Sequence, residues 1–468
     1  MNRSLEASFD NGAEESLKQP FSDDWYCDYY RQKHVDPIYG EIELLDCQRK
    51  LIATPEFNRL RDLKQMGEAN YVFTNANHTR FSHSVGVAHL AKQMYRHLTM
   101  NSRENPYNAN EEILVTTAAM CHDIGHGPNS HAFELWYPTF DHEQMSIRII
   151  ENMMKKGSLS FLDFQTLFSG DINDNFKIVC AMIGGVSHDE ALKLVPRGKL
   201  WLFDIVHNKT HGIDVDKMDY LVRDTHSVFG STHPHVRMSQ IIDSTRIVNG
   251  CLRFNVLACQ QLYELLYLRQ SMHKNVYTHD SVFAVKYMFL DLLHHLDSQT
   301  NHAISKSIND PEEFLLLSDS VFQPWATVRD GKTTPEAKLL WQRIQTQDYY
   351  AVVARKIVYS EPTLTVDTIL KQFENDSSGF DEKDLFLTYN RFDLGNGVGD
   401  PLQGKIFYYH SQHSDYVECT KGREVSSCFY DNRRHTAEYL VRLFTKIQPE
   451  SRPLSAWESL SQAFHKSF

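Results

Sequence analysis

The stretch CHDIGHGPNSH, from Cys121 to His131, constrains the fold of this 468-residue chain more than any other segment. The apolar residues before it predict a buried helix, and two glycines and a proline then end that helix. Three histidines and one aspartate stand at this helix end. A histidine-rich surface turn is the ordinary explanation. The alternative is a metal site, with His122 and Asp123 as adjacent ligands and with His126 and His131 facing the same cavity.

The pair His122–Asp123 differs from the two other His–Asp pairs in the chain, at 188–189 and 279–280. Neither of those has a second histidine four residues later or a glycine-rich break after it. Imidazole nitrogen beside carboxylate oxygen suits a divalent metal such as Fe, Mn, Ni or Zn, and the carboxylate can also reach Mg²⁺. A metal needs more ligands than two, so polar residues at helical spacing elsewhere become candidates.

Three further segments place ionisable side chains on one side of a predicted helix. These are Arg80 with His83; then Asp216, Tyr220 and Asp224, spaced by four, with Lys217 beside the first; and Arg269, His273 and Tyr277, again spaced by four. Such stripes are costly to bury unless they line a common wet cavity. Their number favours that cavity.

Each stripe also has a simpler interpretation. Residues 216–224 could form an exposed helix face with salt bridges. His273 could be a buried histidine with satisfied hydrogen bonds, and the stem of Arg269 could lie along the surface. His142, in TFDHEQMS, taken alone indicates the start of a helix. The metal-site hypothesis therefore depends on the convergence of several features and not on any one of them.

Periodicity along the chain predicts a mainly α protein with a smaller mixed α+β lobe. Residues 1–32 are polar and unpatterned and form a predicted tail. Residues 33–300 are mostly helical, including SVGVAHLAKQMYRHL, EEILVTTAAMCHDIGHG and CQQLYELLYLRQSMHKNVYTH. In the lobe at 301–468, DLFLTYNRFDLGNGVGDP and GKIFYYHSQ predict two strands joined by a glycine-rich loop. TAEYLVRLFTKI predicts a late helix.

Composition restricts the compartment and the partners. Eight cysteines include no C-x-x-C pair, and neither a secretion signal nor a membrane span is recognisable. We therefore expect a chain with reduced thiols in cytoplasm or nucleus and no membrane association. A net charge of −12 does not favour nucleic-acid binding through a general basic field, and a polyphosphate ligand would need cations focused in a cleft.

The motifs together resemble a known family. The order H…HD…D, here His83, His122–Asp123 and Asp216, is the metal-ligand pattern of the HD-domain phosphohydrolases. Around it, DPIYGEIEL, TPEFNRLRDLKQMG, NHTRFSHSVGV, CHDIGHGPNSHAF, DHEQ, GIDVDKMDY and LRQSMHKNVYTH resemble the eukaryotic SAM- and HD-domain deoxynucleoside triphosphate triphosphohydrolases. The resemblance is dense over about residues 33–300 and weaker beyond. The thirty or so residues before it leave no room for a SAM domain.

The resemblance implies a role for each matching position. The metal ligands would be His83, His122, Asp123 and Asp216, with Asp123 or Asp216 reaching a second ion, Mg²⁺ or Mn²⁺. The triphosphate would be bound by Arg80, Lys217 and Arg269, and the scissile phosphorus surrounded by His126, His131 and His142. The sugar would contact Gln65 and Asp224 at its 3′-hydroxyl, Met66 and Tyr277 at its 2′ edge, and Tyr220 between sugar and phosphates, with His273 in the same wall.

The implied reaction is hydrolysis of a dNTP at the α-phosphorus, which yields a deoxynucleoside and tripolyphosphate. His131 would protonate the departing 5′-oxygen, and Glu134, three residues later, would pair with it and raise its pKa. The family has an aspartate at that position and a leucine where this chain has Met66. The alternatives are an HD-type hydrolase of nucleoside monophosphates or cyclic nucleotides, and a non-enzymatic single-stranded nucleic-acid binder.

Regulation is where the sequence departs from the family, whose members assemble into a tetramer around a guanine nucleotide and a dNTP. The aspartate that recognises guanine is replaced by Ala53, and a neighbouring glutamine by Asn58, although Arg61 remains. The cations of the second nucleotide pocket are replaced by Gln240, Asn255, Leu257 and Asp280. We therefore expect activity without GTP, in a dimer or tetramer that forms without nucleotide.

Overall fold

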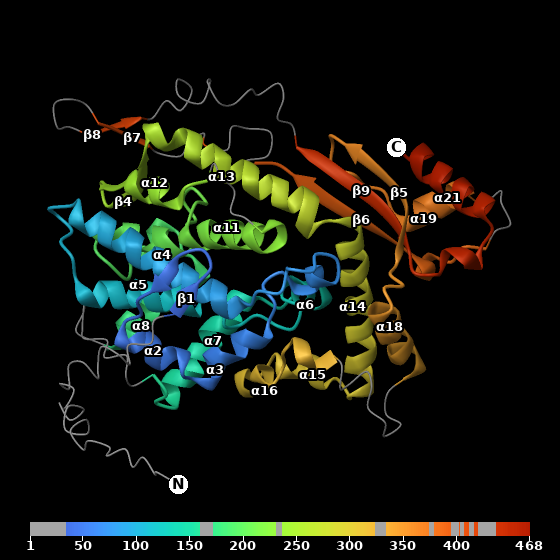
Figure 1. Cartoon of the computed structure of the whole chain (residues 1–468), viewed down its shortest axis with the longest axis horizontal. Coiled ribbons are helices and arrows are strands. Elements are labelled where there is room, and N and C mark those ends of the chain that lie inside the picture. Colours follow the sequence, from blue (N-terminus) through green and yellow to red (C-terminus); the bar gives the residue numbers. More distant parts are fainter. Residues whose placement is uncertain are drawn as a thin grey trace, which may run out of the picture.

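The computed structural model describes residues 34–159, 172–230, 236–322, 334–373, 379–394, 402, 407–410, 416–419 and 437–468. The predicted tail at 1–32 and the glycine-rich loop at 395–400 lie outside them. The fold is mainly α with a mixed C-terminal lobe, which confirms the predicted class (Figure 1). Within the described residues, no helix is both long enough and apolar enough to cross a membrane.

Seven long helices form the body of the molecule: α4 (Arg80–Met100), α5 (Ala109–Cys121), α7 (His142–Lys155), α8 (Ile172–Gly184), α11 (Val215–Phe229), α13 (Cys259–Met272) and α14 (Asp280–Gln299). Shorter helices connect and cover them: α2 (Asp46–Ile52), α3 (Pro55–Asn58), α6 (His131–Trp136), α9 (His188–Ala191), α10 (Phe203–Val206), α12 (Met238–Asp243), α15 (Ala303–Ser307), α16 (Pro311–Leu315) and α18 (Pro335–Gln345). A π-helical turn, η5 (His273–Tyr277), follows α13 directly.

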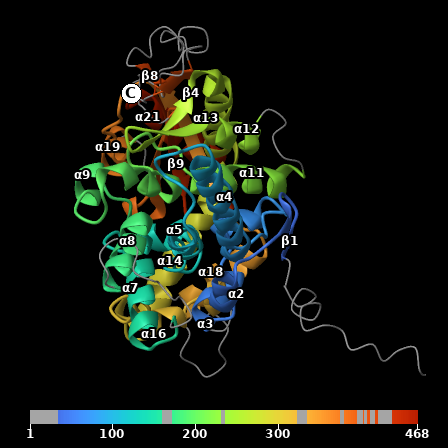
Figure 2. The same cartoon turned by 90° about the vertical axis from the view of Figure 1, so that its left-hand side faces the viewer.

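Helix α4 packs against both α5 and α11 in the body of the molecule (Figure 2). The face of α4 that its apolar spacing predicts is buried, through Val87, Leu90, Met94 and Leu98. Gly86 lies where α4 meets α11. A Cβ there would lie 2.1 Å from a carboxylate oxygen of Asp219, so only glycine permits this approach. The close packing sets the distance between α4, which carries His83, and α11, which carries Asp216.

The turn after α5 explains why glycine and histidine alternate in it. A Cβ on Gly125 would lie 2.3 Å from the carbonyl oxygen of His142, so glycine lets the start of α7 press against the turn. Asn129 and Ser130 both adopt positive φ, 53° and 55°, which is uncommon for residues with a side chain. The turn therefore folds back tightly and delivers its histidines to one place.

The C-terminal lobe is built on an antiparallel sheet of order β5–β9–β6, with β5 (Ala351–Val358), β6 (Leu385–Phe392) and β9 (Glu438–Thr445). Helices α19 (Val366–Phe373) and α21 (Leu454–Lys466) pack beside it (Figure 1). The predicted late helix is wrong, because the described part of TAEYLVRLFTKI forms β9. Val441, Leu443 and Phe444 are buried in this central strand, where alternation is lost because both faces are covered.

A second sheet has the order β3–β4–β7–β8, with β3 (Thr245–Val248), β4 (Cys251–Asn255), β7 (Phe407–His410) and β8 (Tyr416–Cys419). Both β6 and β7 confirm strands expected in the lobe, although they belong to different sheets. The pairing of β4 with β7 links the region before residue 300 to the region after it. The predicted boundary at residue 300 stays a prediction.

Candidate active site

A cavity of about 490 Å³ opens between the ends of α4, α5, α11 and α13. Its wall contains every site residue proposed from the sequence except Glu134: Gln65, Met66, Arg80, His83, His122, Asp123, His126, His131, His142, Asp216, Lys217, Tyr220, Asp224, Arg269, His273 and Tyr277. Glu134 lies just behind the wall, bonded to two of its histidines. The polar stripes thus face a shared cavity, and the stripe at 216–224 is not a solvated helix face.

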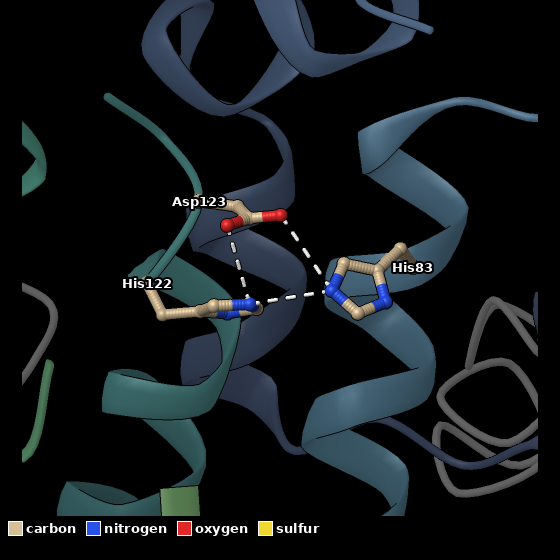
Figure 3. Close-up of side chains that lie close together, drawn as sticks. All are labelled: His83, His122 and Asp123. Carbon is tan, nitrogen blue, oxygen red and sulfur yellow. Dashed lines mark hydrogen bonds and ion pairs between the residues drawn. The ribbon is translucent and has the colours of Figure 1, made fainter. Parts of the chain in front are cut away.

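Four side chains converge at the floor of this cavity. Nε2 of His83 lies 3.3 Å from Nε2 of His122 and 3.1 Å from Oδ1 of Asp216. Asp123 completes the group, with its two oxygens 3.5 Å from His83 and 3.4 Å from His122 (Figure 3). The four come from α4, the end of α5 and the first turn of α11, which are distant in sequence.

The orientation of both imidazoles is fixed from outside. Nδ1 of His122 lies 2.8 Å from the carbonyl oxygen of Ala119, one turn earlier. Nδ1 of His83 lies 2.8 Å from Oδ2 of Asp219, which is fully buried and also accepts hydrogen bonds from Arg223. Their Nε2 atoms are therefore left for the cavity side. Outer partners of this kind orient metal-bound histidines in many proteins.

The electrostatics of the floor favour a cation. Burial lowers the pKa of His83, but hydrogen bonds to Asp216 and Asp219 outweigh this effect and raise the pKa to about 10. Burial alone would raise the pKa of Asp123, yet Arg80 and His122 hold that pKa well below its ordinary value. Two imidazole nitrogens and two ionised carboxylates at one point fit a divalent metal, so the site carries a cluster able to bind one.

A second group of three histidines lies beside this floor. The rings of His126 and His142 stack at 3.8 Å between centroids, and His131 stands edge-on to His126 at 5.1 Å. Glu134 joins two of them, with one carboxylate oxygen 2.7 Å from Nδ1 of His131 and the other bonded to Nδ1 of His142. Burial, followed by the charge of Arg80, lowers the pKa of His126 well below its ordinary value. His126 is therefore neutral beside Asp123.

The cationic side chains of the wall differ in how freely they reach it. Arg80 is 2% exposed and is already held by Asp123 and by Ser130 Oγ at 2.9 Å, so part of its guanidinium braces the floor. Lys217 Nζ lies 2.9 Å from Asp214, which also caps α11 through the Lys217 backbone N–H. Arg269 lies on the last turn of α13 and also lines the cavity. Positive charge is thus focused inside an acidic protein.

Another part of the cavity wall consists of hydrogen-bonding side chains. Tyr277 donates to Asp224 at 2.6 Å, and the other oxygen of Asp224 lies 2.7 Å from Nε2 of His78. Burial and then Arg269 lower the pKa of His273 to about 4, which keeps this imidazole neutral. The side-chain oxygen of Gln65 is buried with no hydrogen-bond partner among the described residues. This edge is therefore suited to hydroxyl groups of a ligand.

Several residues of the site were not predicted from the sequence. Asp219 and His78 orient site residues from behind, and the wall also includes two charged pairs: Lys286 with Glu68 at 3.2 Å, and His207 with Glu143 at 3.2 Å. The spacing of Asp219 from Asp216 and Arg223 on one helix was an available signal. No sequence pattern distinguished His207 or Lys286.

Among the positions expected to affect regulation, Asp280 forms ion pairs with two arginines. Its carboxylate lies 2.9 Å from Nη1 of the fully buried Arg442 and 3.2 Å from Nη1 of Arg355. The charge of Asp280 is therefore balanced within the protein. Asn58 donates to the carbonyl oxygens of Ile52 and Thr54, at the end of α2.

Comparison with known proteins agrees with this geometry. An HD domain matches residues 80–224, the segment that supplies all four floor residues. The fold and the site therefore place the chain in the class of HD-domain proteins.

A more specific match comes from full-length relatives. The deoxynucleoside triphosphate triphosphohydrolase SAMHD1 homolog of Dictyostelium discoideum is 30% identical over 100% of this chain and 87% of its own length. Human deoxynucleoside triphosphate triphosphohydrolase SAMHD1 is 26% identical over 88% of this chain and 70% of its own length. A putative HD domain-containing protein of Acanthamoeba polyphaga mimivirus is 31% identical over 69% of each chain. The chain belongs to the SAMHD1 family of HD-domain proteins, and the family resemblance predicted from its motifs is confirmed.

Proposed function

We propose that this protein is a metal-dependent triphosphohydrolase that converts dNTPs to deoxynucleosides and tripolyphosphate. The observation that carries the proposal is the composition of one cavity. It contains a His–Asp cluster for a cation, focused positive charge, three histidines beside the cluster and a hydrogen-bonding edge with a free acceptor on Gln65. A polyphosphate ester of a hydroxylated sugar needs these groups together. The names of the relatives, which specify dNTP triphosphohydrolase activity, agree.

His83, His122, Asp123 and Asp216 would hold the metal, and their two nitrogens and two oxygens favour Fe, Mn or Zn. A second ion, Mg²⁺ or Mn²⁺, would use the free side of Asp123 or Asp216. The ligand atoms of Asp123, His126 and His142 also lie within 4.8 Å of one another, which supports Asp123 as the shared residue. When bound, the metal lowers the pKa of water and so supplies a nucleophile at neutral pH.

The cationic side chains would bind the triphosphate and stabilise the charge that grows on it as the ester bond breaks. Lys217 stands beside Asp216 on α11, Arg269 lies on the last turn of α13, and both line the cavity where the phosphates would bind. Arg80 contributes from below while it fixes Asp123. With these roles, the α-phosphorus would lie next to the floor cluster.

His131 would donate a proton to the departing 5′-oxygen. Nδ1 of His131 is bonded to Glu134, so Nε2 is available to act as the acid. Glu134 reaches His131 and His142 with separate oxygens. Hydrogen bonds from the two histidines outweigh its burial and hold the pKa of Glu134 well below its ordinary value, which keeps a negative charge beside the donor.

The hydrogen-bonding edge would select the sugar. Asp224 and Gln65 would bind the 3′-hydroxyl, with Asp224 positioned by His78. Tyr277 and Met66 would occupy the space that a 2′-hydroxyl needs. Tyr220 and His273 would line the passage between sugar and phosphates. Ribonucleotides would be excluded mainly by the ring of Tyr277, which the π-helical turn after α13 turns toward Asp224.

We further propose that activity does not require GTP and that the oligomer, a dimer or tetramer, forms without nucleotide. Ala53 offers no side-chain acceptor to a guanine edge. At Asp280, Arg442 and Arg355 already occupy the carboxylate, so charge at this position is balanced without a bound anion.

The test is an assay of dATP and ATP turnover with Mn²⁺ or Mg²⁺, with and without GTP, alongside sizing at several protein concentrations. The proposal expects dATP turnover that GTP leaves unchanged, little turnover of ATP, and an oligomer independent of nucleotide. Equal turnover of dATP and ATP would contradict the sugar selection. Strict dependence on GTP, with GTP-driven assembly, would contradict the proposed regulation while leaving the reaction intact.

A further inference from the structure

A cysteine, a histidine and an aspartate form a hydrogen-bonded chain outside the cavity. Sγ of Cys251, at the start of β4, lies 3.6 Å from Nδ1 of His188 at the start of α9. The other nitrogen of that ring, Nε2, lies 2.9 Å from Oδ1 of Asp204 on α10. Three separate elements thus meet so that one imidazole stands between a thiol and a carboxylate.

The arrangement is fixed by several additional contacts. Asp204 is 2% exposed, and its second oxygen accepts a hydrogen bond from the backbone N–H of Leu252, next to the cysteine. The hydroxyl of Thr210 lies 3.3 Å from Oδ1 of Asp204. The backbone N–H of Trp201 donates to the carbonyl oxygen of Gly250, which holds the β3–β4 hairpin against this region. The imidazole therefore has a defined position.

The geometry distinguishes between two uses of such a cluster. In a metal site, the ligand atoms converge on one point from several sides. Here the two nitrogens of His188 point to different partners, so the three groups form a chain. A thiol, an imidazole and a carboxylate in that order form the arrangement that activates a cysteine nucleophile, because the imidazole accepts the thiol proton and the carboxylate stabilises the resulting cation.

We propose that Cys251 is a reactive thiol that His188 and Asp204 activate toward small soluble disulfides such as glutathione disulfide. In the reactive form, the proton of Cys251 resides on His188, and the Cys251 thiolate beside this imidazolium attacks one sulfur of the disulfide. A new S–S bond forms, the old one breaks, and the departing thiolate takes up the proton from His188. The products are a mixed disulfide on Cys251 and one free thiol, with no other oxidant needed.

Exposure and electrostatics are consistent with this role. The side chain of His188 is 22% exposed and Cys251 is half-buried, so a small reactant can approach. The hydrogen bond to Asp204, followed by the one to Cys251, raises the pKa of His188 to about 10, so this imidazole retains a proton at neutral pH. Burial raises the pKa of the half-buried Cys47, and it raises that of the half-buried Cys180 to about 12.

The proposal is independent of the nucleotide chemistry, and the full-length protein tests it. The reduced chain is treated with limiting iodoacetamide between pH 6 and pH 8, and then digested with trypsin. Cys251 is followed in the peptide of residues 247–253 and Cys47 in that of residues 34–49. The alkylation rate of an ordinary thiol falls about 100-fold from pH 8 to pH 6, because only the thiolate reacts. We expect that fall at Cys47 and a fall of less than about fivefold at Cys251.

Two variants and a disulfide probe complete the test. His188→Asn should slow alkylation of Cys251 at pH 6 at least about tenfold, because the proton acceptor is lost. With glutathione disulfide, the intact mass should rise by one glutathionyl group in the wild type and remain unchanged in Cys251→Ser. Parallel pH profiles for Cys251 and Cys47 in the wild type would overturn the proposal even if the His188 variant failed to fold. Glutathionylation that persists in Cys251→Ser would overturn it as well.

Discussion

Replacement of Asp219 by asparagine tests how the metal cluster is held in place. Oδ2 of Asp219 accepts from Nδ1 of His83 and from Nε of Arg223, both at 2.8 Å, and Oδ1 accepts from Nη2 of Arg223 at 2.9 Å. An asparagine amide keeps the shape but has one acceptor. Its NH₂ must face either His83 or Arg223, and both present N–H donors there. Asp219→Asn therefore loses the orientation of His83 or leaves a buried guanidinium poorly paired.

The expected effect follows from the position of Asp219 directly behind a metal ligand. Loss of such an outer partner weakens metal binding by about 10- to 100-fold, which corresponds to about 1.4–2.7 kcal/mol. The assay is competition against a chelator of known affinity, with bound metal measured by mass spectrometry and dATP turnover measured on the same samples. Turnover at limiting metal should fall in parallel, and excess metal should restore part of it.

Asp297→Asn is the matched control. Asp297 is also a buried carboxylate bonded to a histidine, His302 at 3.0 Å, but it lies at the far end of α14 and not in the cavity wall. It should leave metal affinity unchanged. If folded Asp219→Asn protein binds metal within twofold of the wild type, Asp219 does not orient His83 and the reasoning is refuted.

Two further predictions follow from the helix contact and the proton donor. Gly86→Ala places a methyl group 2.1 Å from Asp219 and should destabilise the fold by about 1–3 kcal/mol in denaturant titrations. Gly198→Ala is the control, because a Cβ there meets no atom within 4 Å, and it should leave the stability unchanged. Equal stability of the two variants would contradict the contact. His131→Ala should retain bound metal and lose about 10²–10⁴-fold in turnover, with Glu134→Gln intermediate; an inactive protein without metal would instead assign His131 to metal binding.

The sequence predicted the mainly α fold class, and it predicted most of the residues that line the cavity. The helix at 80–100 was predictable because apolar residues recur in it at helical spacing, and Val87, Leu90 and Met94 are buried as expected. The site residues were recognisable because polar stripes interrupt faces that packing would make apolar, as at Asp216, Tyr220 and Asp224. Their convergence on one cavity required the glycines at 86 and 125, whose role becomes visible only when neighbouring helices are placed.

The failures have equally physical causes. The segment around Val441 resembles a helix because a central strand that is buried on both faces has no alternation. The pairing of Asp280 with Arg442 could not be predicted, because the two residues lie 162 positions apart in sequence and no local pattern records their contact. Cys251 and His188 were unremarkable in sequence for the same reason, since three distant elements create their contact.

The measurement that tests the central claim most directly is the fate of water oxygen during dATP hydrolysis in ¹⁸O-labelled water. Attack at the α-phosphorus with cleavage of the bond to the 5′-oxygen places the label in tripolyphosphate and leaves the deoxyadenosine unlabelled. The proposed function predicts these two products in equal amounts, with metal required and with dATP strongly preferred over ATP. Formation of dAMP and pyrophosphate, or label in the 5′-hydroxyl of deoxyadenosine, would contradict it.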